Sequence, residues 1–136
     1  MSSVERRFRL LVHADVDRDI EDLEDHDPDQ AAAVIQLIEE LEEDRQLCEK
    51  LVDVSYDDHQ IQSVTEFWAV QNKGYNVYRV RLWEVDDWRV LTAVDHRQNL
   101  IGILYIMKRD ENYDATVQDR VIKAYEDLGF TKLGRH

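Results

Sequence analysis

The sequence predicts a single α+β domain, in which two N-terminal helices and one C-terminal helix pack on an antiparallel β-sheet. The length of 136 residues suits one domain with one core. Helical spacing of apolar residues is confined to the N-terminal third and the C-terminus. The region between them has the pattern of consecutive strands joined by short turns, which favours antiparallel pairing. Helices and strands are therefore segregated along the chain, as in α+β proteins.

The N-terminal third predicts one strand and two helices. A strand is expected at residues 6–12, and residues 15–25 form a short acidic segment with apolar residues three apart, which indicates an amphipathic helix. Asp27 can cap a second helix, and Pro28 suits its first position. Apolar residues at steps of three, four and seven predict that this helix continues through residues 31–51 with one buried stripe.

The central region predicts four strands, and the C-terminus predicts a helix. The strands are expected at residues 64–70, 76–83, 88–94 and 100–107, after a loop at 52–63 and with turns at 71–74, 84–87 and 95–99. The last strand, LIGILYIM, is apolar on both faces and should lie centrally in the sheet. Residues 114–128 return to helical spacing, and Gly129 supplies a stop signal.

Charge is distributed unevenly along the chain. The formal net charge is −13, yet residues 73–109 hold seven Lys and Arg against four Asp and Glu. Residues 1–72 hold six against twenty. Cations gathered on one sheet of an acidic protein predict that this surface meets an anion. In the alternative interpretation, each Arg pairs with a nearby carboxylate such as Asp86, Asp87 or Asp110, and the acidity is a solubility feature.

The cations of this region form a candidate site. Alternate residues of a strand share a face, so Arg79 and Arg81 present two guanidinium groups on one surface, about 7 Å apart. Arg89 returns beside them on the next strand. Three further candidates follow at the end of the last strand: Lys108, Arg109 and Tyr113. The set lacks a nucleophile but offers bidentate phosphate recognition and a stacking ring.

The histidines, the single cysteine and the clustered carboxylates predict few functional sites. His96 lies in the turn beside the basic sheet and is a candidate substrate contact or acid–base group. The five histidines are scattered and Cys48 stands alone, so neither a metal nor a cofactor site is expected. The carboxylates between residues 39 and 44 are expected to form a solvated helix face. The chain has no membrane-length apolar run and no signal peptide, so we expect a soluble cytoplasmic protein.

Three segments together resemble a known family. Residues 78–82 (YRVRL), 88–95 (WRVLTAVD) and 106–113 (IMKRDENY) are similar in order and spacing to the RelE/ParE superfamily of bacterial type II toxins. The resemblance covers most of the chain and implies one RelE-like toxin domain over residues 1–136. It also implies a cognate antitoxin protein as partner. In the ribosome-dependent branch, it implies a metal-independent endoribonuclease that cuts mRNA on the ribosome.

The resemblance assigns a role to each candidate residue. Arg79 and Arg81 match paired basic residues that contact RNA and help activate the attacking 2′-hydroxyl. Arg89 matches the arginine that stabilises the transition state. Arg109 matches a cation that binds phosphate and assists the leaving group, and Tyr113 matches a tyrosine that stacks on a substrate base.

Two alternatives stay open beside the nuclease. One is a ParE-like inhibitor of DNA gyrase, and the other is a non-catalytic RelE-fold binding protein. The acidity favours these alternatives, because a pocket walled by rRNA phosphates repels an acidic body within a Debye length of ~8 Å. A guanidinium, with a pKa above ~12, is also a poor proton acceptor where a general base is needed.

Overall fold

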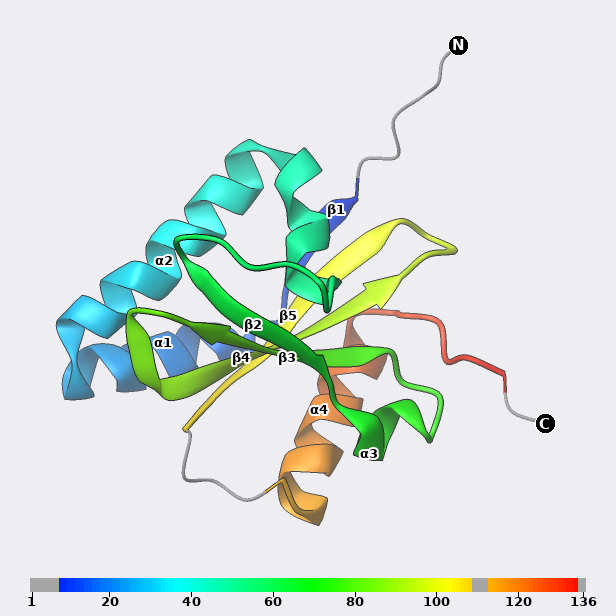
Figure 1. Cartoon of the computed structure of the whole chain (residues 1–136). Helices are drawn as coiled ribbons and strands as arrows, with labels where there is room; N and C mark the ends of the chain where they lie inside the picture. Colours follow the sequence, from blue (N-terminus) through cyan, green and yellow to red (C-terminus); the bar gives the residue numbers. More distant parts are fainter. Residues whose placement is uncertain (1–7, 109–112, 135–136) are drawn as a thin grey trace, which may run out of the picture.

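The computed structural model describes residues 8–108 and 113–134, which form an α+β fold with one five-stranded mixed sheet and helices on both of its faces (Figure 1). The elements in chain order are β1 (Arg9–Val12), α1 (Asp15–His26), α2 (Pro28–Glu43), the 3₁₀ helix η1 (Arg45–Val52), β2 (Ile61–Glu66), α3 (Trp68–Gln71), β3 (Val77–Leu82), β4 (Val85–Asp95), β5 (Leu100–Lys108) and α4 (Ala115–Asp127). None of the described helices has the length and apolar character needed to cross a membrane.

The sheet has the strand order β1-β5-β4-β3-β2, and it is not purely antiparallel as the sequence predicted. Strands β2 to β5 form an antiparallel meander, but β1 pairs with β5 in parallel. Short turns dictate antiparallel pairing only between consecutive strands. Two helices and η1 follow β1 before the chain enters the sheet again, so its direction is set by packing instead.

Two hydrophobic cores lie on the two faces of the sheet. Helices α1 and α2 and η1 cover the first face, which includes Val80 and Val90. Helix α4 covers the second face, which includes Leu91 and Leu104. Residues 100–107 of β5 are all buried, which confirms the predicted central position of this strand.

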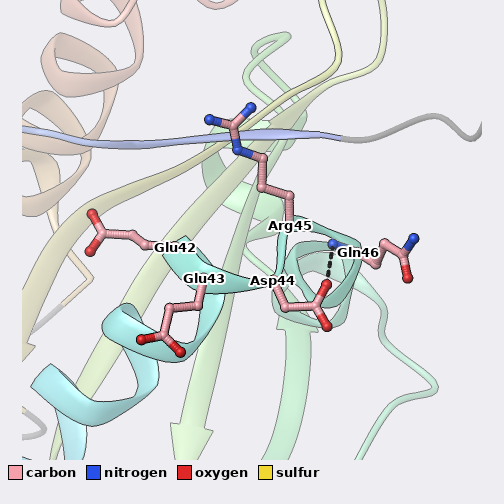
Figure 2. Close-up of a pocket in the computed structure, with 5 residues that line it drawn as sticks. All are labelled: Glu42, Glu43, Asp44, Arg45 and Gln46. Carbon is pink, nitrogen blue, oxygen red and sulfur yellow. Dashed lines mark hydrogen bonds between the residues drawn. The ribbon is translucent and has the colours of Figure 1, made fainter.

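The long second helix ends earlier than predicted. Helix α2 stops at Glu43, because the backbone of Asp44 is extended (φ −131°, ψ 93°). Its carboxylate accepts a hydrogen bond from the Gln46 backbone N–H at 3.1 Å and so caps η1 (Figure 2). Glu42, Glu43 and Asp44 point their carboxylates in different directions around this bend. The bend lets η1 lie on the sheet, where the Thr92 hydroxyl donates to the Leu51 carbonyl at 2.8 Å.

Strands β2 and β4 also differ from their predicted bounds. Strand β2 runs over Ile61–Glu66 instead of residues 64–70, because the Asp58 carboxylate accepts from the backbone N–H groups of Gln60 and Ile61 and fixes the strand entry. Residues 68–71 form the short helix α3. Strand β4 begins at Val85 because Leu82 and Val85 pair directly across a two-residue turn.

Candidate functional site

Three of the predicted arginines and the predicted tyrosine line one open pocket. The pocket has a volume of about 340 Å³, and its lining consists of Ser63, Thr65, Arg79, Arg81, Arg89 and Tyr113. We call it the arginine pocket. It lies on the second face of the sheet, over strands β2, β3 and β4 and beside the start of α4.

Strand register explains how these residues come together. Thr65 pairs with Arg79 and Ser63 pairs with Arg81 across β2 and β3, so each pair projects from the same face. Arg79 also pairs with Leu91 of β4, and Arg89 lies two residues earlier in that strand, on the same face as Leu91. The prediction that the first two arginines share a surface with the third is therefore confirmed.

Arg79 lies over an aromatic ring. Its guanidinium carbon lies 4.8 Å from the centroid of the Tyr113 ring, within the range of a cation–π interaction. The Tyr113 ring in turn meets the buried Phe67 ring edge to face, with centroids 5.2 Å apart. This contact places Tyr113 beside Phe67, the residue that follows β2.

The three arginines have different partners. Arg89 donates from Nη1 to the backbone carbonyls of Asp86 at 3.1 Å and Trp88 at 2.9 Å. Arg81 is exposed. Within the described part of the chain, neither Arg79 nor Arg81 forms an ion pair with a carboxylate. Surface ion pairing of these two side chains is therefore not seen with Asp86, Asp87 or any other described carboxylate; Asp110 lies outside the described residues.

Lys108 does not belong to this site. It pairs with Trp88 across β4 and β5, and its Nζ lies 5.7 Å from the centroid of the Trp88 ring. Trp88 packs in the core of the first face, below α1 and α2. Lys108 therefore projects from the face opposite the arginine pocket. The structure therefore does not bring Lys108 beside the predicted arginines. Met107 pairs with Arg89 and shares its face, and Lys108 is the next residue along the strand.

His96 is likewise not brought to the arginine pocket. It lies in the exposed turn between β4 and β5, and its ring meets the Phe8 ring edge to face at 5.9 Å. It lines a different pocket together with Tyr78 and Val94, which pack against the core of the first face. Arg109, the predicted leaving-group cation, lies outside the described residues.

Sequence reasoning missed three residues of the site. Ser63 and Thr65 supply hydroxyl groups to the pocket, and Phe67 supports Tyr113. The first two were missed because the strand was predicted to begin at residue 64. With that start, the residues that pair with Arg79 and Arg81 could not be derived. A strand placed at Ile61–Glu66 would have shown both hydroxyls opposite the two arginines.

The chemistry available to this arrangement is anion binding. Guanidinium groups present several N–H donors in a plane and suit phosphate oxygens. The described lining residues include no carboxylate and no imidazole, and a guanidinium cannot accept a proton in proteins. The described residues also contain no group of His, Cys, Asp or Glu side chains arranged to hold a metal ion.

Comparisons of the chain with models of protein families, with curated proteins and with solved structures found no significant match.

Proposed function

We propose that this chain is a RelE/ParE-like toxin that cuts mRNA on the ribosome without a metal ion. The observation that supports this most directly is the joint lining of one pocket by Arg79, Arg81, Arg89 and Tyr113. These four residues were singled out by their resemblance to RNA-contacting residues of the family. A bacterial cytoplasm and a cognate antitoxin that covers the arginine pocket are part of the proposal.

The reaction requires charge stabilisation above all. The 2′-oxygen of one nucleotide attacks the adjacent phosphorus, and the bond from phosphorus to the 5′-oxygen breaks. The products are a 2′,3′-cyclic phosphate and a 5′-hydroxyl, so the proton lost by the 2′-hydroxyl balances the proton gained at the 5′-oxygen. Negative charge grows on the phosphoryl oxygens in the transition state. Preorganised donors such as Arg89, held by two backbone carbonyls, stabilise that charge.

A second function is favoured by the composition of the pocket. The described lining residues offer no carboxylate or imidazole to accept the proton of the 2′-hydroxyl. A protein with this pocket can bind a phosphodiester without cleaving it. The second candidate is therefore a non-catalytic binding protein that uses the same pocket for the same kind of ligand.

Induced expression in a bacterium tests the proposal. The wild type is compared with Arg81→Ala, Arg89→Ala and the matched control Lys108→Ala, which removes a cation from the opposite face of the sheet. We expect growth arrest with in-frame cuts in mRNA for the wild type and the control, and loss of both in the two arginine variants.

Three other outcomes contradict the nuclease. Arrest with damaged DNA and intact mRNA would indicate gyrase as the target. RNA retention by the purified wild type without any cut would indicate the non-catalytic binding protein. Equal arrest in all four strains would show that the arginine pocket plays no part in toxicity.

A further inference from the structure

The arginine pocket contains a column of three groups in successive contact. Phe67, at the end of β2, is buried and contacts the Tyr113 ring at 5.2 Å with an interplanar angle of 72°. The guanidinium carbon of Arg79 lies over the Tyr113 ring, 4.8 Å from the ring centroid. The column begins in the core of the second face and ends in the pocket. Both Arg79 and Tyr113 line the pocket.

Among the described residues, Arg79 is held by the Tyr113 ring and not by hydrogen-bond acceptors. Its Nε is enclosed by the protein and has no hydrogen-bond partner. No described carboxylate lies within ion-pair distance of its guanidinium. The contact with Tyr113 places the guanidinium over the ring, where Arg79 also lines the pocket.

We propose that Arg79 is the residue on which an unpaired RNA base stacks, and that Tyr113 and Phe67 are positioning residues for it. A base that enters the pocket cannot reach the face of Tyr113 that Arg79 covers. Arginine stacks on planar π-systems through its flat face, and base stacking is a main source of affinity for single strands. Phosphate binding falls to Arg81 and Arg89. The inference rests on the proposed RNA-directed function and changes the roles that the resemblance implies for Arg79 and Tyr113.

Arg79 and Arg81 should respond differently to the same conservative change. Arg81 is exposed and has no ring over its guanidinium among the described residues, so it can bind a phosphate through its planar fork of N–H donors. Lysine keeps the positive charge but lacks this planar fork. Arg79→Lys should therefore remove base stacking, whereas Arg81→Lys should affect the contact with the backbone of the RNA.

The experiment measures binding of two RNAs by fluorescence anisotropy. One is a fluorescein-labelled single-stranded 12-nucleotide RNA, and the other has the same backbone with abasic sites at its central positions. We expect Arg79→Lys to weaken binding of the base-containing RNA about tenfold and to leave abasic binding unchanged. Tyr113→Leu should give the same base-selective loss. Arg81→Lys should weaken both RNAs to the same extent.

A salt titration provides a second readout. Arg81→Ala should reduce the slope of log K against log salt concentration by about 0.7, the value for one phosphate contact to a single strand. Arg79→Lys should leave that slope unchanged. Lys108→Ala is the matched control, and its binding of both RNAs should equal that of the wild type.

Each remaining outcome overturns the inference. Equal losses for both RNAs in Arg79→Lys, or no loss, would show that Arg79 contacts phosphate or nothing. If the wild type still binds RNA and cuts mRNA in that case, the proposed function stands without the inference. If the wild type binds neither RNA, the proposed function and the inference fail together.

Discussion

The carboxylate of Asp19 joins the two helical layers around the edge of the sheet. It accepts a hydrogen bond from Nη2 of Arg120 at 2.6 Å and another from the backbone N–H of Ile106 at 3.0 Å. Asp19 belongs to α1 on the first face, and Arg120 belongs to α4 on the second. Strand β1 pairs with β5 only as far as Ile103. Asp19 therefore satisfies a donor of β5 beyond the end of its partner strand.

Replacement of Arg120 should destabilise the fold, because the buried carboxylate of Asp19 would lose its positively charged partner. Burial raises the pKa of Asp19, and the hydrogen bonds from Arg120 and Ile106 offset that effect only in part. In Arg120→Met the carboxylate loses its cation, so we expect the free energy of unfolding at pH 7 to fall by about 3 kcal/mol. The loss should shrink as the pH falls through the raised pKa, because the protonated carboxyl needs no cation. Urea denaturation at pH 7 and pH 4 measures both values.

The double variant Asp19→Asn/Arg120→Met is the control for charge. Asparagine keeps an oxygen that can accept from the Ile106 N–H but carries no charge. The double variant should be more stable at pH 7 than Arg120→Met alone. A cost of Arg120→Met that is the same at both pH values would show that lost packing on Tyr105, which Arg120 contacts at 3.5 Å, causes the loss instead.

Asp95 should make the fold sensitive to acid. Burial acts to raise its pKa, but hydrogen bonds from Thr131 and Gln98 outweigh burial and lower the pKa from 3.8 to about 2. A carboxylate with a lowered pKa stabilises the fold above its unfolded value of 3.8. That contribution, about 2 kcal/mol, should be lost as the pH falls from 4 through 2. In urea titrations over this range, Asp95→Asn should lose less stability than the wild type, and parallel curves would contradict the prediction.

A side chain at position 102 should destabilise the fold. A Cβ at this position of β5 would lie 2.9 Å from Cζ of Phe130 and 3.2 Å from Cδ1 of Leu128. Phe130 is buried in the second core, so its ring must shift. We expect Gly102→Ala to lower the free energy of unfolding by about 1–3 kcal/mol, as overpacking does. Gly134→Ala is the matched control, because a Cβ there meets nothing within 4 Å. Equal melting temperatures for the two variants would contradict this packing argument.

If the chain has the proposed nuclease activity, Arg89→Ala should slow mRNA cleavage more than it destabilises the fold. Loss of a donor aimed at developing charge costs about 10²–10³ in kcat. The two backbone carbonyls that Arg89 contacts belong to residues of the same strand, so the fold should hold. Single-turnover cleavage of ribosome-bound mRNA, with Lys108→Ala as control, separates kcat from KM. A KM effect alone would show that Arg89 binds the ground state and the transition state equally.

Local periodicities of the sequence predicted much of the candidate site. Alternation along β3 placed Arg79 and Arg81 on one face, and the short hairpin brought Arg89 beside them. These features depend on backbone geometry within one or two strands, so the residues alone specify them. Strict alternation along β5 would have put Lys108 on the face of Leu104 and Arg89; the register shift that leaves Leu104 without a partner moves Lys108 to the opposite face.

The sequence by itself determined where most helices and strands form, which residues of each strand share a face, and that β5 lies inside the sheet. Only the tertiary structure decided that β1 runs parallel to β5, that Tyr113 supports Arg79, and that Asp19 reaches Arg120 around the sheet edge. Alternation and helical period are properties of neighbouring residues. Contacts between distant segments depend instead on how side chains from the whole chain pack into the two hydrophobic cores.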